Sequence, residues 1–209
     1  MIVAIARELG AGGRAVGEAV AATLSVELLD NQIVDLVAQR LGAPESYVAE
    51  RDEHVESFAE RLLRGITAAY PESQAARGVP DWSEAHLVQL TGTIIKERAA
   101  SESLVVIGRG APILLKDRAD VVRVFVTAPI EVRVARIAER LGVSREEALK
   151  ELRKSDQHRA AYYKEHYGVA EWRDARHYDL VVDTARFGID SAAQLVIDAV
   201  NVLAARTAR

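Results

Sequence analysis

The stretch IVAIARELGAGGR, at residues 2–14, decides the fold of this 209-residue chain. Its first five residues form a short apolar run, which is typical of a buried strand, and three glycines within four residues follow. A helix-like stretch comes next, from Ala15 to Leu24. Glycines let the backbone turn sharply with its N–H groups facing an anion, and the start of a helix adds a partial positive charge. A simple connection would need fewer glycines, so the stretch predicts an anion-binding loop between a strand and a helix.

Two kinds of anion-binding loop fit these residues. The pattern Gly10-x-Gly12-x-x-Ala15 matches the dinucleotide fingerprint, and Asp30 stands near the end of the next strand, where a ribose-binding acid would lie. Alternatively, Gly12-Gly13-Arg14 is an altered phosphate loop in which Arg14 replaces the usual lysine. The loop by itself leaves both interpretations open.

Four further apolar runs predict strands, and helical patterns separate them. The runs are Val26–Leu29, Leu104–Ile107, Val122–Val126 and Leu180–Val182. Short apolar runs that alternate with helices indicate βαβ units and a mostly parallel sheet covered on both faces. We therefore predict an α/β fold with a five-stranded sheet.

Several helices can be placed from apolar periodicity and capping residues. They are Asn31–Leu41, Ile130–Leu141, a long helix that the capping box Ser144-x-x-Glu147 opens towards Lys164, and a final helix capped by Asp190. The stretch from Pro44 to about Ala100 has no convincing strand, and Pro71 and Pro80 interrupt it. Residues 44–100 are too long for a simple crossover, so they predict a helical insertion that carries substrate contacts.

Composition excludes several classes of protein. The chain is 49% hydrophobic and 28% charged with a net charge of −4, which excludes wholesale disorder and argues against a nucleic-acid partner. It has no cysteine and no closely spaced histidine pair, so disulfides, thiol nucleophiles and a zinc site are not expected. We found no apolar run near the roughly 18 residues of a membrane span and no signal peptide at the start. We therefore expect a cytoplasmic protein without a membrane partner.

Cationic residues favour phosphoryl transfer over hydride transfer, because a charge-dispersed transition state needs several cations around it. Arg109 follows a buried strand at its carboxyl end, where ligands bind in open α/β sheets. Arg133, Arg136 and Arg140 form a stripe opposite the apolar face of a predicted helix, and a solvated surface explains that stripe equally well.

The predicted helix after Ser144 carries a second group of candidates. Asp156 and Arg159 are three residues apart and project from one face, as part of a site or as a local ion pair. Aromatic residues gather at and beyond the end of this helix, and we interpret them as a packed cluster rather than a stacking surface for a base. They are Tyr162, Tyr163, Tyr167, Trp172 and Tyr178.

Six short segments carry a resemblance when they are taken in order along the chain. They are RELGAGGR at 7–14, LLDN at 28–31, Gly108-Arg109-Gly110, VFVTA at 124–128 followed by Arg133 and Arg136, Asp156-x-x-Arg159, and Asp183-Thr184. In this order they resemble the cytidylate kinase-like family, relatives of bacterial cytidylate kinase among the nucleoside monophosphate kinases. The match runs from about Ile5 to Ala199 and leaves only the insertion without a counterpart.

The resemblance implies a P-loop kinase-like, three-layer α/β/α fold in a single domain over residues 1–209. Residues 44–100 would be the acceptor-binding region and residues 130–168 a helical lid. The implied reaction is ATP-dependent phosphorylation of CMP or dCMP with Mg²⁺, so the implied partners are ATP and a pyrimidine nucleoside monophosphate.

The resemblance also implies roles for individual residues. The phosphates of ATP would be held by Gly10, Ala11, Gly12, Gly13, Arg14 and Ala15. The catalytic residues that act on the transferring phosphoryl group would be Arg14, Arg133 and Arg136. The acceptor would be bound by Asp30, Asn31, Arg109, Asp156 and Arg159.

Three residues depart from the family pattern and leave the metal ligands unknown. Ala15 lacks the hydroxyl that commonly holds Mg²⁺, and Gly110 and Thr127 stand where the family carries aspartate. These departures keep a second interpretation open, a nucleotide-binding or regulatory module with weak or no turnover. A dehydrogenase is the third interpretation, and a homo-oligomer formed through the insertion is an open possibility.

Overall fold

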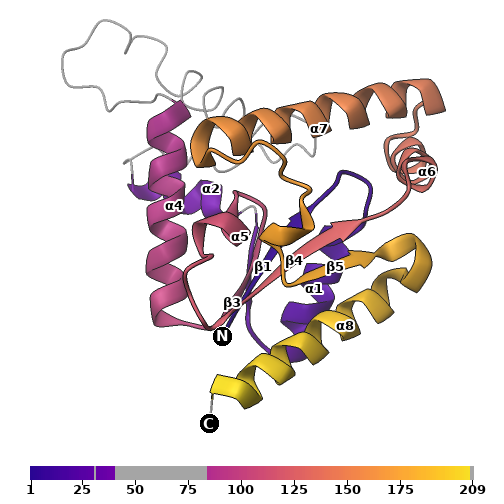
Figure 1. The fold of residues 1–209 in the computed structure, drawn as a ribbon. Coiled ribbons are helices and arrows are strands. Elements are labelled where there is room, and N and C mark those ends of the chain that lie inside the picture. The colour runs from indigo at the N-terminus through magenta and orange to yellow at the C-terminus, as the bar shows by residue number, and fades with distance from the viewer. Residues whose placement is uncertain (31, 41–83, 208–209) are drawn as a thin grey trace, which may run out of the picture. The chain divides into compact units, whose positions relative to one another are not determined.

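The computed structural model describes residues 1–30, 32–40 and 84–207, shown as coloured ribbon in Figure 1. The chain divides into two compact units, one formed by residues 1–30 and 98–209 and the other by residues 31–97. Asn31 and most of the predicted insertion, including Pro44, Pro71 and Pro80, lie outside the described residues.

The first unit is built on a five-stranded sheet in which every neighbouring pair of strands is parallel. The strands are β1 Ile2–Arg7, β2 Glu27–Leu29, β3 Leu104–Ile107, β4 Val121–Thr127 and β5 Leu180–Asp183. The predicted five-stranded α/β fold is therefore confirmed. Because all strands run the same way, all five carboxyl ends lie at one edge of the sheet.

The order of the strands is β2-β3-β1-β4-β5. In the dinucleotide-binding order the second strand lies beside the first, whereas here β3 separates β2 from β1. The interpretation of Gly10-x-Gly12-x-x-Ala15 and Asp30 as a dinucleotide fingerprint is therefore wrong, because Asp30 does not follow the strand next to β1.

The helices follow the predicted pattern with one difference. They are α1 Gly13–Leu24, α2 Gln32–Arg40, α4 Glu84–Ser101, α5 Ala111–Leu114, α6 Ile130–Leu141, α7 Arg145–Tyr167, the 3₁₀ turn η3 Ala175–His177 and α8 Thr184–Thr207. The capping box of α7 is formed in both directions, since the N–H of Glu147 donates to Ser144 Oγ and the N–H of Ser144 to Glu147 Oε2.

Asp190 was predicted to cap the final helix, and the long segment of α8 starts beside it, directly after a kink at Gly188. A short helical segment precedes the kink and starts at Thr184, where the Asp183 carboxylate accepts hydrogen bonds from the N–H groups of Ala185 and Arg186. Gly188 interrupts the helix with φ 77° and ψ 172°, which is a conformation open to glycine. The sequence pattern therefore located the long segment of α8 and missed the short segment before the kink.

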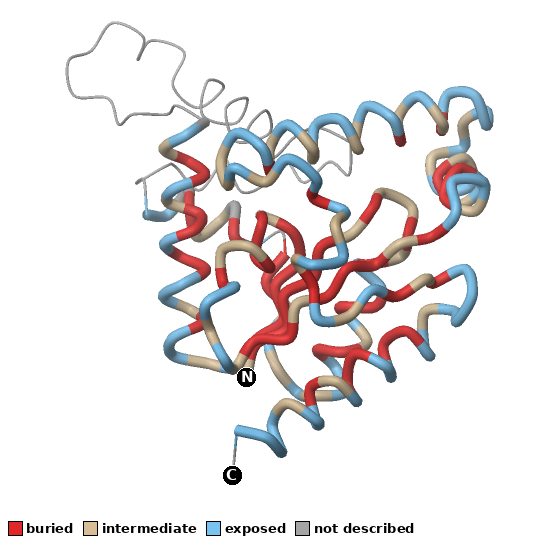
Figure 2. Tube along the Cα trace, in the orientation of Figure 1, coloured by how far each residue is buried: buried red, intermediate tan, exposed pale blue. Residues whose placement is uncertain are grey.

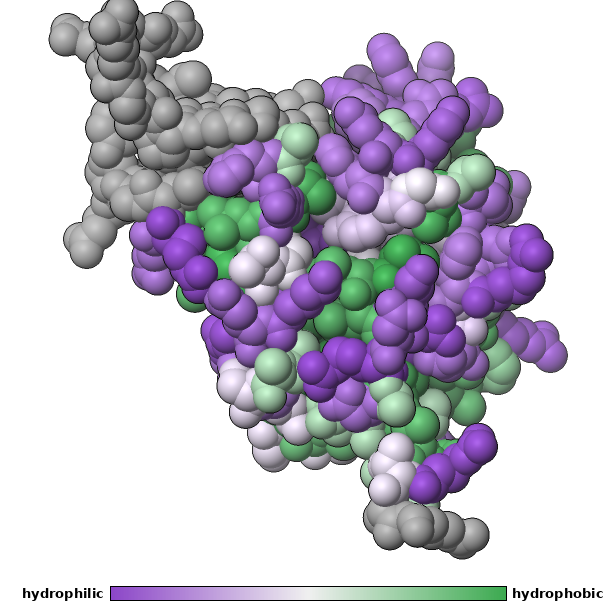
Figure 3. All heavy atoms as spheres, turned by 60° about the vertical axis from the view of Figure 1, so that its left-hand side comes forward, coloured by the Kyte–Doolittle hydropathy of each residue, from purple (hydrophilic) through white to green (hydrophobic). Residues whose placement is uncertain are grey.

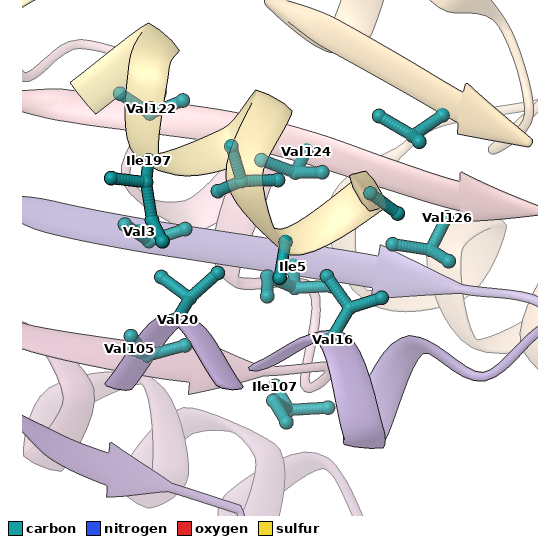
Figure 4. Close-up of a cluster of buried hydrophobic side chains, with 14 of the residues drawn as sticks. Val3, Ile5, Val16, Val20, Val105, Ile107, Val122, Val124, Val126 and Ile197 are labelled. Atoms are coloured by element: carbon teal, nitrogen blue, oxygen red, sulfur yellow. The ribbon is translucent and has the colours of Figure 1, made fainter. Parts of the chain in front are cut away.

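Helices α1 and α8 cover one face of the sheet (Figure 1). Their apolar side chains pack on alternate residues of the strands, as Figure 4 shows for Val16, Val20 and Ile197 around Val3 and Ile5. The three central strands β3, β1 and β4 are buried along most of their length (Figure 2), as expected for a parallel sheet covered on both faces, whereas the edge strands β2 and β5 are partly exposed.

The length and composition of α8 would by themselves suffice to cross a membrane. One face of this helix is buried in the core through Ala192, Ala193, Val196, Ile197 and Val200. This packing accounts for part of its apolar composition, since 28% of its most apolar 18-residue window is buried.

An aromatic core packs on the opposite face of the sheet. Phe125 of β4 lies 5.4 Å from the ring of Trp172 and 5.0 Å from that of Tyr178, and Tyr163 of α7 lies 5.7 Å from Trp172. The prediction that these aromatic residues form a packed cluster is confirmed. Because the cluster fixes Trp172 against the sheet, it also places the segment that follows α7.

A smaller apolar core joins α6 to α7. Val134 and Ile137 pack against Ala148 and Leu152, and Leu9 of the glycine loop packs on the same group.

Hydrophilic side chains predominate on the face seen in Figure 3, around a smaller apolar area.

In the second unit, α2 and most of α4 are described. Arg40 of α2 and Glu97 of α4 form an exposed ion pair with 2.7 Å between NH2 and Oε2.

Candidate active site

The glycine loop connects β1 to α1 and leaves the start of α1 open to an anion. Gly10 and Gly12 have φ of 78° and 80°, the left-handed region that favours glycine. Among the described residues no side chain caps the helix at Gly12, and the first turn carries no acid. The first N–H groups of a helix lack partners within it, so this end can bind a phosphate.

The loop is packed so closely that Gly10 has no room for a side chain. A Cβ atom on Gly10 would lie 2.8 Å from the backbone oxygen of Arg133 on α6. The loop and the first turn of α6 are thus in direct backbone contact.

Arg14 and Asp30 lie together at the carboxyl edge of the sheet. Arg14 is exposed, and its Nε donates a hydrogen bond of 2.9 Å to Glu18 on the same helix. Its guanidinium is 3.8 Å from the buried carboxylate of Asp30, and Arg7 at the end of β1 is equally far from the other oxygen of Asp30. The structure therefore adds Arg7, which the sequence analysis did not single out, to the predicted pair.

Arg109 lies in a strained turn after β3. Gly108, Arg109 and Gly110 have φ of 76°, 55° and 67°, and a positive φ is uncommon for a residue with a side chain. The hydroxyl of Tyr167 donates a 2.7 Å hydrogen bond to the carbonyl oxygen of Arg109, and the tyrosine ring lies against Gly110. Burial raises the pKa of Tyr167, so this hydroxyl stays protonated as a donor. The end of α7 thereby fixes the turn that carries Arg109.

Tyr167→Phe removes the hydrogen bond to this turn while keeping the ring. We expect a loss of about 1 kcal/mol in the free energy of unfolding, because a part-buried carbonyl oxygen is left without its donor. Urea denaturation measures the loss. A Tyr167→Phe protein as stable as the wild type would show that the bond does not hold the turn.

Four charged side chains form a closed ring beside the loop, and we call them the charge ring. Arg133 NH1 lies 3.1 Å from Glu8 Oε1, and its NH2 lies 2.7 Å from Asp156 Oδ2. Arg173 meets the same two oxygens, with Nε 2.8 Å from Glu8 Oε1 and NH2 2.7 Å from Asp156 Oδ2. Thr127, at the end of β4, donates to the other oxygen of Glu8 at 2.6 Å.

Three members of the charge ring are withdrawn from solvent, whereas the fourth, Arg173, is 39% exposed. Arg133 is 2% exposed and Glu8 is 8% exposed. Burial raises the pKa of Asp156, and the guanidinium groups of Arg133 and Arg173 partly offset that rise. Two carboxylates and two guanidinium groups balance in charge, so the loop carries an acid without presenting a net negative charge to a phosphate.

Arg159 adds a further cation next to the charge ring. Its NH1 donates to Ser155 Oγ at 2.7 Å and lies 3.9 Å from Asp156 Oδ1, so its local ion pair is long. Burial, and then the positive charge of Arg7, lower the pKa of Arg159 to about 10, which leaves it protonated at neutral pH. Arg7, whose NH2 is 3.8 Å from Asp30, is thus also near enough to Arg159 for its charge to act on that guanidinium.

The predicted arginine stripe on α6 is wrong as a single surface. Arg133 is buried in the charge ring, whereas Arg140 is exposed. Arg136 is half-buried and donates to Thr184 Oγ1 at 2.9 Å and to the carbonyl oxygen of Gly10 at 3.3 Å. The spacing correctly placed these residues on one helix, but burial differs along it because only the N-terminal part of α6 meets the loop.

Four residues at this site were missed by sequence reasoning: Arg7, Glu8, Arg173 and Thr184. Arg7 and Glu8 stand inside the quoted loop, and their position at the end of β1 was the available signal. Thr184 donates to the carbonyl oxygen of Ala11 at 2.6 Å, next to the quoted Asp183. In the sequence, nothing marked Arg173 except its neighbour Trp172. In the structure, the Arg173 guanidinium lies over the Trp172 ring, 4.9 Å from its centre.

The described residues do not fit a dedicated magnesium site. Among them, no group of three or more His, Asp or Glu side chains is placed to hold a metal ion. The Glu8 and Asp156 carboxylates bind guanidinium groups, and the Thr127 hydroxyl donates to Glu8. Mg²⁺ prefers oxygen ligands and is commonly held by one or two carboxylates together with substrate phosphates, so these side chains are poor candidates for its ligands.

Comparison with known proteins places this geometry among kinases. A family model described as the cytidylate kinase-like family matches residues 2–186. The cytidylate kinase of Thermococcus sibiricus is 35% identical over 107 residues, which cover 51% of this chain and 54% of that protein. The chain spans about half the length of the curated relatives it matches.

Solved structures share the fold. An uncharacterized protein from Eubacterium ventriosum has a TM-score of 0.70 at 22% identity, covering 96% of this chain and 98% of that one. Shikimate kinase from Bacteroides thetaiotaomicron has a TM-score of 0.54 at 18% identity, with the same coverage of each chain. These similarities concern the fold, which is that of the P-loop kinases.

Proposed function

The chain belongs to the cytidylate kinase-like family, and on this premise we propose that it transfers the γ-phosphoryl group of ATP to CMP or dCMP. The observation that carries the proposal is the open start of α1 at the glycine loop, next to the Arg136 guanidinium, which donates to the carbonyl oxygen of Gly10. Phosphoryl transfer is catalysed mainly by positioning and by charge stabilisation, which this combination can supply.

The donor phosphates are proposed to bind at the loop. The backbone N–H groups of Gly10, Ala11, Gly12, Gly13, Arg14 and Ala15 would face them, with the positive end of α1 behind. Arg14 would turn from Glu18 towards the phosphates, which its exposed position allows. Mg²⁺ would arrive on the ATP phosphates, since the described side chains do not fit it.

The acceptor is proposed to bind across the carboxyl edge of the sheet. Asp30, Arg109, Asp156 and Arg159 would contact its base, sugar or phosphate, together with Asn31, which lies outside the described residues. Residues 44–100 remain the proposed acceptor-binding region, and residues 130–168, which contain α6 and α7, remain the proposed lid.

Transfer needs no general base in this proposal, because the attacking phosphate oxygen of a nucleoside monophosphate is already ionised at neutral pH. Arg136 would stabilise the transferring phosphoryl group, since it already contacts the loop at the carbonyl oxygen of Gly10. Arg133 would contribute through the charge ring, because its guanidinium is 2% exposed and bound to two carboxylates.

A coupled assay with ATP and a panel of nucleoside monophosphates tests the proposal. We expect ADP formation with CMP or dCMP, and a loss of about 10²-fold in kcat for Arg136→Met, the size found when one stabilising donor is removed. Arg140→Met is the matched control, because Arg140 is exposed on the same helix, and its rate should stay within about twofold. Background ADP formation with every acceptor, from folded protein, would refute the proposal.

A second candidate function is a nucleotide-binding module without turnover. Two observations favour it: Ala15 offers no hydroxyl at the start of α1, and the Arg14 guanidinium is bound to Glu18. Titration calorimetry beside the assay separates the two, since tight binding of ATP or CMP without ADP formation supports the module and ordinary turnover eliminates it.

A further inference from the structure

We propose that Glu8 is a positioning residue whose carboxylate, acting through Arg133 and Arg173, fixes Asp156 of α7 relative to the phosphate loop. The inference rests on the proposed function, because it links the loop assigned to the donor with a residue assigned to the acceptor. It assigns a role to Glu8 and Arg173, which the family resemblance left without one.

The connectivity of the charge ring carries the proposal. Glu8 Oε1 is shared by the two guanidinium groups, and Asp156 Oδ2 is shared by the same two groups. The four residues come from the loop, from α6, from α7 and from the segment after α7. Two carboxylates repel each other, so the attraction between loop and α7 at this point passes through Arg133 and Arg173.

Each corner of the charge ring is anchored by independent packing. Arg133 precedes Val134 in the α6–α7 core, and Arg173 follows Trp172 in the aromatic core. Thr127 holds the second oxygen of Glu8 from the end of β4. With its supports fixed, the ring can transmit the position of one element to another, since little of a displacement is absorbed by loose side chains.

Stability alone does not explain buried charges at this place. The charge ring lies between two apolar groups, the aromatic core and the α6–α7 core. Replacing a buried ion pair by apolar residues of similar volume is often neutral or stabilising for the fold. The charged groups add geometric specificity. A guanidinium that binds two carboxylates allows few arrangements of the loop, α6 and α7 relative to one another.

The arrangement leaves one oxygen of Asp156 for another partner. Oδ2 is used by both arginines, whereas Oδ1 is buried without a hydrogen bond among the described residues, with Arg159 NH1 at 3.9 Å. Because both oxygens belong to the Asp156 carboxylate, fixing Oδ2 also fixes the direction of Oδ1. A displaced Glu8 would misplace Oδ1 without any contact between Glu8 and the acceptor.

A double-mutant cycle tests the coupling between Glu8 and Asp156. Glu8→Gln and Asp156→Asn keep side-chain shape while removing charge, and each is expected to lower kcat/KM for CMP by about 10²-fold, the cost of a misplacement near 1 Å. In the Asp156→Asn background, Glu8→Gln should change kcat/KM by no more than about twofold, because the ring is already open. If the two losses instead multiply to about 10⁴-fold, the residues act independently and the inference is wrong.

Asp179→Asn is the matched control for losing a carboxylate that holds an arginine. Asp179 binds Arg123 through both oxygens, at 2.6 and 3.0 Å, outside the charge ring. We expect its kcat/KM to stay within about twofold of the wild type. A tenfold loss in this control would show that any broken ion pair lowers the rate, and would overturn the assignment of Glu8.

Arg173→Met provides a second test of the inference if the Glu8→Gln protein does not fold. Arg173 is 39% exposed, so its removal is easier to tolerate than that of a buried group. The charged groups around Asp156 are Glu8 of the loop, Arg133 of α6, Arg159 of the same helix as Asp156, and Arg173. Removing Arg173 takes away one cation that lowers the pKa of Asp156, so the acidic limb of the pH–rate profile should move to higher pH. An unmoved limb would contradict the inference, because a purely structural defect lowers the amount of active protein without moving it.

Failure of the inference is distinguishable from failure of the proposed function. A wild-type protein that makes no ADP with any acceptor refutes the function and the inference together. An active wild type whose Glu8 and Asp156 losses multiply refutes the inference alone.

Discussion

Arg133→Met is expected to lower the free energy of unfolding by about 3–5 kcal/mol, the usual cost of removing one partner from a buried ion pair. Methionine keeps much of the volume but leaves Glu8 and Asp156 with Arg173 as their remaining shared cation. Because Arg133 is 2% exposed, water cannot replace the lost guanidinium without opening the α6–α7 core. Urea denaturation followed by far-UV circular dichroism measures the loss.

Arg140→Met is the control for this substitution. Arg140 lies two turns further along the same helix and is exposed, so its replacement should change stability by less than about 0.5 kcal/mol. Adding Asp156→Asn to Arg133→Met should recover part of the loss, because it removes one of the two carboxylates left short of a partner. A loss below about 1 kcal/mol for Arg133→Met would mean that the charge ring is open to solvent, contrary to the burial found here.

Gly10→Ala is expected to cost more than about 2 kcal/mol in stability and to abolish the rise in Tm that we expect ATP to produce in the wild type. The left-handed conformation at φ 78° costs a residue with a side chain about 1–2 kcal/mol. The new Cβ atom would also lie 2.8 Å from the backbone oxygen of Arg133, and a backbone atom cannot rotate away. The loop must therefore shift, and its N–H groups would no longer converge on a phosphate.

Gly142→Ala separates the conformational cost of a side chain at positive φ from the cost of the steric clash. Gly142 ends α6 with φ 65°, and a Cβ atom there would meet no atom within 4 Å. Its substitution should cost only the conformational part, about 1 kcal/mol, and should keep the thermal shift with ATP. If Gly10→Ala kept a wild-type shift with ATP, the loop would not be the phosphate site.

The sheet was predictable because its signals are local. Each strand is a short, largely apolar run, and all five were placed within one residue of their ends, with Val121 and Thr127 extending the β4 run. The capping box at Ser144 and Glu147 placed the start of α7 because both hydrogen bonds lie within four residues. The short helical segment after β5 was missed, because its start depends on hydrogen bonds from Ala185 and Arg186 to the Asp183 carboxylate.

The candidate site was predictable only in part. The glycine loop, Asp30 and the Asp156–Arg159 spacing could be found, because their chemistry is carried by neighbouring residues. The burial of Arg133 could not, since helical periodicity places it on the polar side of α6. Arg173 could not be found either, because its partner Glu8 lies 165 residues away in the chain.

The sequence by itself therefore determined the α/β class, the anion-binding loop and the resemblance to a kinase family, because backbone conformation and apolar periodicity depend on residues close together in the chain. The tertiary structure decided the strand order, the turn around Arg109 and the pairing of Glu8 and Asp156 with Arg133 and Arg173. The physical reason is that a charged side chain has no preferred partner until folding removes water from around it. Which opposite charge then lies within reach depends on how distant segments pack.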